Sequence, residues 1–332
     1  MRALVTGGCG FIGSNLVHAL TGLGWTVDVV DDMSNGRLEF LDGLAFKVVP
    51  GFLLNQYREK YESSRDPGCV LVIESDFEDK LVLERVRNGS YDRVFHLAAN
   101  PRVSQSVESP AATTDVNCTR TLSLLEAIRD CRSEVRFVFS STCALYGDAS
   151  SLPTREDSDV RPNSPYGLQK RFVEEYIRIA VSLHNIDAVC LRYFNVYGPR
   201  QVADSAYATA ITAWCGRVKE SKPLRSDGDG EQTRDLVYVT DVVRANILAA
   251  AREERFQGEV INIGSGKRYS NNMILSMFSK RIPGVEVVHA PPRPGDVRHT
   301  QANIDMAREV LGYVPQVQFE DGLNRTWDWW GI

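Results

Sequence analysis

Residues 3–15 of the chain read ALVTGGCGFIGSN, and this stretch decides the fold. The apolar run Ala3–Thr6 predicts a short buried strand, and the amphipathic pattern that follows predicts a helix. Three glycines separate the two elements at GxxGxxG spacing: Gly7, Gly10 and Gly13. Glycines in such a turn permit positive φ and let the backbone approach a pyrophosphate, whose charge the free N–H groups at the helix start can bind. The stretch therefore predicts a dinucleotide-binding site.

An acidic residue closes the second predicted strand, Thr26–Val30. Asp31 follows Gly13 at close to the spacing of about 20 residues at which such folds hydrogen-bond the adenosine ribose. Its carboxylate would repel a 2′-phosphate, so we expect NAD as the cofactor rather than NADP. Arg37 is the one nearby residue that favours NADP.

Strands and helices alternate along the first half of the chain. Further strands are predicted over Val70–Glu74, Arg93–His96, Arg136–Ser140, Ala188–Arg192 and Val260–Ile263. Helices are predicted over Ser14–Gly24, Lys80–Asn88, Ala111–Arg129 and Pro165–His184. Apolar strands without alternation, joined by helices, are typical of a parallel sheet covered on both faces. We expect an α/β fold, a Rossmann-type doubly wound parallel sheet with a smaller, discontinuous α/β substrate domain.

The pattern loosens after Arg192, and this change sets the expected domain boundaries. Residues 1–192 plus 236–263 are expected to form the NAD-binding Rossmann domain, and residues 193–235 plus 264–332 the substrate-binding domain. Leu236–Arg252 is interpreted as a strand and a helix that return to the main sheet. Residues 43–66 are long for a connection between two strands and are expected to carry a helix of their own.

Composition excludes several classes of protein. The 332 residues are 43% hydrophobic and 24% charged with a net charge of −5, which is typical of a soluble globular protein. Without a basic block or a long apolar run, we expect no nucleic-acid partner and no membrane partner. Glycines interrupt the first apolar stretch, so we expect no signal peptide. Seven scattered cysteines without a CxxC pair favour a reducing, cytoplasmic environment and no metal site.

A candidate catalytic pair follows the predicted strand Arg136–Ser140. Tyr166 and Lys170 form a YxxxK pair, which places both side chains on one face of a helix. A phenol, with a usual pKa of ~10, becomes a base near neutrality when a neighbouring ammonium and the positive nicotinamide ring lower its pKa. The hydroxyl of Thr142, at the end of the strand, would orient the substrate oxygen. We predict Thr142, Tyr166 and Lys170 as the catalytic residues.

Eight motifs carry a resemblance that spans nearly the whole chain. They are TGGCGFIGSN (6–15), DDMSNGR (31–37), VFHLAAN (94–100), FSSTCALYG (139–147), SPYGLQK (164–170), LRYFNVYGPRQ (191–201), GDGEQTRDLVYV (228–239) and RPGDVRH (293–299). On these motifs the sequence resembles an extended short-chain dehydrogenase/reductase of the NAD-dependent nucleotide-sugar epimerase/dehydratase family. It is most similar to bacterial UDP-N-acetylglucosamine/UDP-glucose 4-epimerases.

The resemblance implies a set of site residues. The implied NAD-binding residues are Gly7, Gly10, Phe11, Ile12, Gly13, Asp31, Asp32, Asn35, Gly36, Asp76, Phe77, Ala98, Ala99, Asn117, Ser140, Tyr166, Lys170 and Tyr193. The implied substrate-binding residues are Thr142, Cys143, Asn195, Arg234, Arg298 and Thr300. Thr300 stands where family members restricted to UDP-glucose and UDP-galactose tend to carry a bulky Tyr, so the resemblance implies a pocket that admits an N-acetyl group.

The resemblance also narrows the reaction. Family members that are 4,6-dehydratases carry Asp and Glu directly after the Thr, and decarboxylases usually carry the Glu, but here these positions are Cys143 and Ala144. A simple 4-epimerisation needs no other base than Tyr166, which takes the 4-hydroxyl proton while NAD takes the C4 hydride. The 4-keto sugar then turns about its diphosphate and receives the hydride on its other face.

Several readings of the substrate stay open at this point. The expected substrates are UDP-GlcNAc and UDP-GalNAc, with UDP-glucose and UDP-galactose as further candidates. The alternative is a UDP-glucuronate 4-epimerase, in which Arg200, Ser141 and Thr142 would face the carboxylate. Another nucleotide-sugar epimerase, a reductase or dehydratase, and a non-catalytic NAD-binding regulator are less favoured. The family also implies a homodimer, formed through helices 111–129 and 165–184 as a four-helix bundle.

Overall fold

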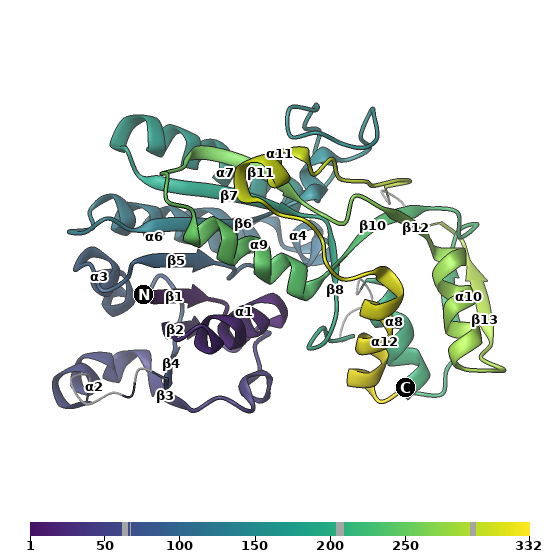
Figure 1. The fold of residues 1–332 in the computed structure, drawn as a ribbon, viewed down its shortest axis with the longest axis horizontal. Helices are drawn as coiled ribbons and strands as arrows, with labels where there is room; N and C mark the ends of the chain where they lie inside the picture. Colours follow the sequence, from purple (N-terminus) through teal and green to yellow (C-terminus); the bar gives the residue numbers. More distant parts are fainter. Residues whose placement is uncertain (62–65, 67, 204–208, 293–296) are drawn as a thin grey trace.

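The structure, a computed structural model, describes residues 1–61, 66, 68–203, 209–292 and 297–332. Its larger part is an eight-stranded parallel sheet in the order β11-β7-β6-β5-β1-β2-β4-β3 (Figure 1). The strands are β1 (Arg2–Thr6), β2 (Thr26–Asp31), β3 (Phe46–Pro50), β4 (Val70–Glu74), β5 (Arg93–His96), β6 (Arg136–Thr142), β7 (Asp187–Tyr193) and β11 (Gln257–Ile263). The chain winds outwards from β1 in both directions, which confirms the predicted doubly wound fold class.

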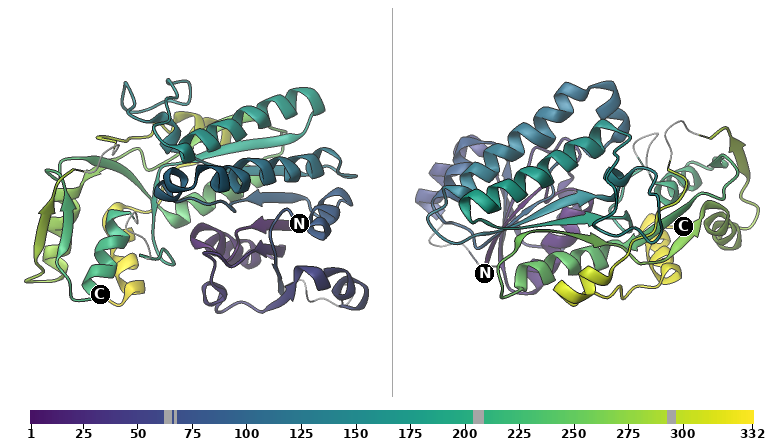
Figure 2. Two further views of the ribbon diagram at one scale, coloured as in Figure 1. Left: turned by 180° about the vertical axis from the view of Figure 1, so that it is seen from behind. Right: turned by 90° about the horizontal axis from the view of Figure 1, so that it is seen from above.

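Helices cover both faces of this sheet (Figure 2). One face carries α1 (Phe11–Gly22) and α9 (Val239–Ala251), and the other carries α3 (Lys80–Arg87), α6 (Arg120–Arg129) and α7 (Pro165–His184). The alternation of side chains along β1 separates the two layers. Val5 packs with Leu16 of α1, whereas Leu4 belongs to the apolar cluster that includes Leu124 of α6 and Val173 of α7.

A smaller lobe lies beyond the carboxyl ends of the main strands (Figure 1). Its strands are β8 (Asn195–Tyr197), β9 (Leu224–Asp227), β10 (Thr233–Tyr238), β12 (Arg268–Ser270) and β13 (Val287–Ala290). They form one sheet in the order β12-β10-β8 and the pair β13-β9. Its helices are α8 (Ala210–Lys219), α10 (Asn271–Arg281) and α12 (Phe319–Trp330), while α11 (Asp305–Leu311) packs near β11.

The structure corrects three expectations about the elements. The segment 43–66 contains the expected helix, α2 (Leu54–Tyr61), but before it lie η2 (Gly51–Leu53) and an edge strand that the sequence did not predict, β3. The strand at the start of 236–252 is β10, and it pairs with β8 and β12 instead of returning to the main sheet. The single helix expected over 111–129 is divided. Its parts are α5 (Pro110–Thr114), a π-helical turn η4 (Asp115–Thr119) and α6.

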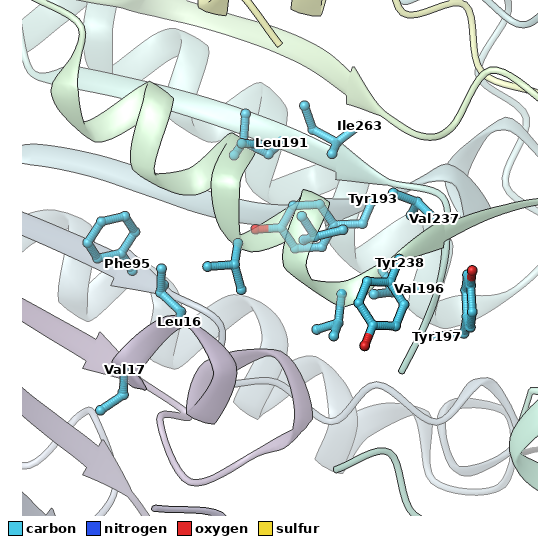
Figure 3. Packing of buried hydrophobic residues seen from close by; sticks show 14 of the residues in the cluster. Leu16, Val17, Phe95, Leu191, Tyr193, Val196, Tyr197, Val237, Tyr238 and Ile263 are labelled. Carbon is cyan, nitrogen blue, oxygen red and sulfur yellow. The ribbon is translucent and has the colours of Figure 1, made fainter. Parts of the chain in front are cut away.

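One apolar core joins the two lobes (Figure 3). Leu16 of α1, Leu191 of β7 and Ile263 of β11 belong to the same buried cluster as Val237 and Tyr238 of the smaller lobe. Protein interiors pack as densely as organic crystals, so a shared core fixes the parts that it joins. The space between the lobes therefore has walls with a defined separation. The remaining short elements are η1 (Leu38–Leu41), α4 (Val103–Glu108) and η5 (Cys143–Tyr146).

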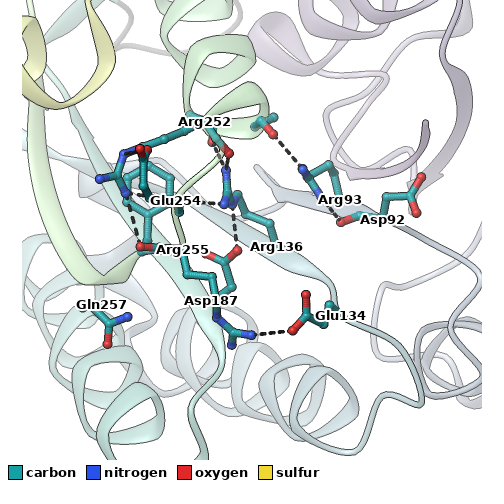
Figure 4. Close-up of polar contacts among 12 residues, drawn as sticks. Asp92, Arg93, Glu134, Arg136, Asp187, Arg252, Glu254, Arg255 and Gln257 are labelled. Atoms are coloured by element: carbon teal, nitrogen blue, oxygen red, sulfur yellow. Dashed lines mark hydrogen bonds and ion pairs between the residues drawn. The ribbon is translucent and has the colours of Figure 1, made fainter.

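A buried arginine holds the amino ends of the central strands (Figure 4). Arg136, the first residue of β6, donates to Asp187 Oδ2 at 2.9 Å. It also donates to the carbonyl oxygens of Ala249, Arg252 and Glu254 at and just beyond the end of α9. The last carbonyls of a helix lack intrahelical partners, so these bonds satisfy groups that would otherwise be buried unpaired. This fixed end of β6 lies opposite the end that carries Thr142.

Candidate active site

A cleft of about 1060 Å³ lies between the sheet and the smaller lobe. Its lining comes from the glycine turn after β1, from the carboxyl ends of β4, β5 and β6, and from β9 and β10. Ligands of open α/β sheets bind outside the carboxyl ends of the strands, where the strand order reverses. The cleft is thus the expected position for both a cofactor and a substrate.

The glycine turn fits a dinucleotide. Gly7 has a φ of +70°, and a Cβ there would come within 2.8 Å of the Ala98 backbone nitrogen. A Cβ on Gly13 would lie 2.1 Å from the carbonyl oxygen of Gly7. Helix α1 begins directly after its N-cap residue, Gly10. No side chain caps the first N–H groups of the helix. Only glycine fits this cradle, and the uncapped helix start can bind the pyrophosphate.

Asp31 is held rigidly beside this turn. Its Oδ2 accepts from the Cys9 backbone N–H at 2.9 Å, and its Oδ1 accepts from the Met33 N–H at 3.0 Å. Burial raises the pKa of the carboxyl, and the two N–H bonds oppose this shift. Arg37 is exposed and does not line the cleft; its guanidinium lies 5.8 Å from the ring centroid of Phe40. The surroundings of Asp31 therefore favour a ribose diol over a 2′-phosphate.

Helix α7 aims the YxxxK pair into the cleft. The helix begins at Pro165, where the Ser164 hydroxyl accepts from the Gly167 N–H at 3.2 Å. Tyr166 and Lys170 both line the cleft. The Tyr166 hydroxyl is hydrogen-bonded to the Thr142 side chain at the end of β6. Because Thr142 Oγ1 also accepts from the Ala144 N–H at 3.2 Å, its position is fixed by the turn η5.

The electrostatics of this pair differ from the sequence expectation. Burial raises the pKa of Tyr166 above its usual range, the neighbouring Cys143 adds to this shift, and the bond with Thr142 opposes it. Burial lowers the pKa of Lys170 to about 8. The Lys170 ammonium donates to the Ser140 carbonyl oxygen at 2.8 Å. Desolvation, which sequence spacing cannot predict, is the largest influence on the pKa of Tyr166.

The structure gathers most of the predicted site residues along the cleft. Lining residues that were predicted are Gly7, Gly10, Phe11, Ile12, Gly13, Asp31, Asp32, Asn35, Gly36, Asp76, Phe77, Ala98, Ala99, Ser140, Cys143, Tyr166, Lys170, Tyr193, Asn195, Arg234 and Thr300. Their individual roles stay predictions. Thr142 is not a lining residue itself but bonds to Tyr166, which is.

Besides Thr142, two predicted residues lie outside this lining. Asn117 is buried in the π-helical turn, where its side chain bonds to the backbone of Asn100 and to Gln169 Oε1. It therefore supports the cleft residue Asn100 instead of facing the cleft. Arg298 is exposed and pairs with Asp229 at 2.7 Å. Both side chains turn towards partners that are distant in sequence.

Sequence reasoning also missed several lining residues. Asn100, Arg102, Trp214 and Asp227 all line the cleft. Asn100 ends the motif VFHLAAN, which is the one signal that could have indicated it. Of the other three, Arg102 directly precedes α4, Trp214 lies within α8 and Asp227 ends β9. Their place at the cleft depends on the tertiary fold.

Comparisons with known proteins agree with this geometry. The profile of the NAD dependent epimerase/dehydratase family matches residues 3–264. The UDP-N-acetylglucosamine 4-epimerase of Methanobrevibacter ruminantium M1, solved with UDP-N-acetylmuramic acid, has a TM-score of 0.86 and 32% identity, covering 99% of this chain and 97% of that one. The UDP-glucose 4-epimerase of Thermotoga maritima, solved with UDP-glucose, has a TM-score of 0.85 and 35% identity, covering 100% and 99%.

A third similar structure contains the cofactor. The UDP-glucuronic acid 4-epimerase of Bacillus cereus, in complex with UDP-glucuronic acid and NAD, has a TM-score of 0.82 and 31% identity, covering 100% of this chain and 99% of that one. The chain belongs to the NAD dependent epimerase/dehydratase family. Within that family it is an NAD-dependent nucleotide-sugar 4-epimerase, an isomerase with NAD as its cofactor.

Two features are absent from the described residues. No group of three or more His, Cys, Asp or Glu side chains among them could hold a metal ion. In the same ranges, no helix is long and apolar enough to cross a membrane.

Proposed function

We propose that this enzyme interconverts the C4 epimers of a UDP-hexose, with UDP-GlcNAc and UDP-GalNAc as its preferred substrates. One observation carries the proposal. Tyr166, which is hydrogen-bonded to Thr142, lines the same cleft as the glycine turn and Thr300. A proton acceptor between a cofactor cradle and a sugar wall is the arrangement that a reversible oxidation at one carbon needs.

Tyr166, Thr142 and Lys170 each have a distinct role in the proposed reaction. Tyr166 takes the proton from the C4 hydroxyl and returns it to the same oxygen after the sugar has turned. Thr142 orients that oxygen, and Lys170 holds the end of β6 through its bond to the Ser140 carbonyl. NAD, when bound, supplies the acceptor and donor of the C4 hydride. Cys143 and Ala144 offer no second acid or base, because burial raises the pKa of the Cys143 thiol to about 12.

Thr300 supports the N-acetylhexosamine assignment. Its side chain is small and lines the cleft, and its hydroxyl lies 3.4 Å from Asn195 Oδ1. A larger side chain at this place would fill space that a substituent at C2 of the sugar requires. The UDP moiety is proposed from the similar epimerases described above, whose ligands are UDP-sugars.

UDP-glucuronate is the second candidate substrate. Arg200 and Ser141 line the cleft and could face a carboxylate. However, the Arg200 guanidinium bonds to Asn15 Oδ1 at 2.9 Å and lies 3.1 Å from His18 Nε2. Ser141 donates to Glu174 at 2.6 Å. Both donors are already engaged, so the geometry favours the uncharged hexoses.

The test is incubation of the purified protein with single UDP-sugars, followed by NMR of the C4 configuration and by NADH absorbance. We expect UDP-GlcNAc to reach equilibrium with UDP-GalNAc, without net formation of NADH. Turnover of UDP-glucuronate alone would favour the second candidate. Stoichiometric release of NADH with a changed sugar would contradict an epimerase.

We also propose that the enzyme is a homodimer. Helix α7 exposes an apolar stripe at helical spacing, formed by Leu168, Phe172, Ile179 and Leu183, which are 45–70% exposed. Contiguous apolar surface of this kind marks a protein interface. The most common assembly of identical chains is a two-fold dimer.

A further inference from the structure

The YxxxK pair continues by one more turn along α7. Tyr166, Lys170 and Glu174 recur every four residues, so they form one row on the helix. Their partners are consecutive residues at the end of β6: Ser140, Ser141 and Thr142. Lys170 Nζ bonds to the Ser140 carbonyl, and the Tyr166 hydroxyl bonds to Thr142. Glu174 supplies the third contact, because its Oε1 accepts from the Ser141 hydroxyl at 2.6 Å.

Glu174 is a buried charge whose closest cationic partner is Arg192, while Arg171 Nη1 lies 3.8 Å from its Oε2. Arg192 of β7 donates to it twice, from Nε to Oε1 at 2.9 Å and from Nη2 to Oε2 at 2.8 Å. The two side chains are only 1–2% exposed. A buried ion pair contributes little net stability compared with apolar residues of the same volume, whereas its hydrogen bonds fix the geometry of the groups that it contacts.

Arg192 ties this pair to the turn that follows Thr142. Its Nη1 donates to the Tyr146 hydroxyl at 2.7 Å and to the Glu156 carbonyl oxygen at 3.2 Å. The Tyr146 hydroxyl in turn donates to Asn262 Oδ1 at 2.7 Å. The network therefore holds β6, the turn η5, β7 and β11 together beneath the catalytic row.

We propose that Glu174, held by Arg192, is a positioning residue for the epimerisation. It fixes Ser141, and because Ser141 lies between the two residues that bond to Lys170 and Tyr166, it sets the distance between the hydroxyls of Thr142 and Tyr166. The inference rests on the proposed roles of Thr142, Tyr166 and Lys170. Glu174 does not touch the substrate, and it acts through Ser141.

The charge of Glu174 adds a second effect on the same row. It raises the pKa of Lys170, whereas burial lowers that pKa to about 8. The other titratable groups near this ammonium are Cys118 of the π-helical turn, Cys190 of β7 and His96 of β5. Removing the carboxylate while Arg192 stays positive lowers the pKa of Lys170 further. The ammonium is then lost at a lower pH, so the rate falls at a lower pH as well.

The test compares Glu174→Gln with a matched control on the same helix. The control is Glu175→Gln, whose side chain is 37% exposed and pairs with Arg171 and Arg178 near the helix surface. For Glu174→Gln we expect kcat to fall about 10-fold, as for the loss of one charge-assisted hydrogen bond. We expect KM to change less than twofold, NAD content to stay equal, and the alkaline limb of the kcat–pH profile to move to lower pH. The control should match the wild type in all four readouts.

Two further variants separate the possible outcomes. If Glu174→Gln does not fold, Ser141→Ala decides, since it removes one hydroxyl and leaves the ion pair intact. A lower kcat in Ser141→Ala at unchanged melting temperature supports the proposal, and an unchanged kcat overturns it. A folded Glu174→Gln with wild-type kcat and pH profile also overturns it. Tyr166→Phe tests the proposed function on which this inference rests. If Tyr166→Phe is inactive while Glu174→Gln is normal, only the present inference fails. If Tyr166→Phe is active, the proposed function fails.

Discussion

At the scale of single residues, Thr300 has its hydroxyl bonded on both sides. Its Oγ1 accepts from the Asp235 backbone N–H at 3.1 Å and lies 3.4 Å from Asn195 Oδ1. Asp235 itself is fully buried, and its carboxylate accepts from the backbone N–H groups of Ser265, Gly266 and Ala302. Thr300 therefore belongs to a fixed wall, which cannot retreat from a larger side chain at little cost.

Thr300→Tyr is the residue-scale test of substrate choice. A tyrosine occupies the space proposed for the N-acetyl group, and overpacking a fixed wall costs about 1–3 kcal/mol. We expect kcat/KM for UDP-GlcNAc to fall about 10-fold or more, while kcat/KM for UDP-glucose changes little. Steady-state kinetics on both sugars measure this ratio, and UDP-glucose serves as the internal control. An equal fall for both sugars would show that Thr300 does not face C2.

Sequence motifs predict which residues lie near the site more reliably than they predict the direction in which the side chains point. Asp31 and the pair Tyr166 and Lys170 line the cleft, because the local turn and the helix period fix their directions. Arg298 and Asn117 do not, because Asp229 and the Asn100 backbone draw them elsewhere. Such competition between partners distant in sequence leaves no local signal.

At the scale of elements, the glycine turn and α1 carry a matched pair of glycines. A Cβ on Gly13 would lie 2.1 Å from a backbone oxygen, whereas a Cβ on Gly22, in the same helix, would meet nothing within 4 Å. We expect Gly13→Ala to weaken NAD retention about 10-fold or more, because backbone must shift at a cost of about 1–3 kcal/mol. Gly22→Ala should keep its NAD and melt at the same or a higher temperature. Cofactor content after gel filtration and thermal melts measure both variants.

One result for Gly13→Ala would contradict this prediction. Full NAD content and a normal melting temperature in Gly13→Ala would mean that the turn relaxes without moving away from the pyrophosphate. The cradle as described would then not be the determinant of cofactor binding.

Elements differ in how well local pattern predicts them. The central strands β1, β5 and β6 are buried apolar runs and were predicted nearly to their ends. The edge strand β3 was missed because its residues Phe46–Pro50 are only partly buried and include a lysine and a terminal proline. Strand β10 was recognised, but its assignment to a sheet depends on β8 and β12, whose positions the local sequence does not encode.

At the scale of the whole molecule, the exposed stripe on α7 predicts the assembly. Phe172→Glu places a charge in the centre of this surface and should convert the dimer to a monomer, because an unpaired carboxylate cannot be buried there. Phe52→Glu is the control, since Phe52 is 77% exposed on a different part of the chain. Analytical ultracentrifugation at micromolar concentration measures both. A wild-type monomer, or a Phe172→Glu dimer, would contradict the proposed interface.

The doubly wound architecture follows from the alternation of strands and helices, and the sequence predicted it. The distance between the two lobes could not be predicted from the sequence in the same way. It depends on the shared core around Leu191, Ile263, Val237 and Tyr238, whose members meet only after folding. The cleft between the lobes, and with it the relation of Thr300 to Tyr166, therefore needed the structure.

The central claim is that Tyr166 moves the C4 proton beside a retained NAD, and the turnover of Tyr166→Phe on UDP-GlcNAc tests it most directly. This change removes the ionisable oxygen and keeps the ring, and Tyr176→Phe on the same helix is the control. We expect kcat to fall at least ~100-fold in Tyr166→Phe, with NAD content equal to that of the wild type and Tyr176→Phe fully active. Near wild-type turnover by Tyr166→Phe with its NAD bound would contradict the account.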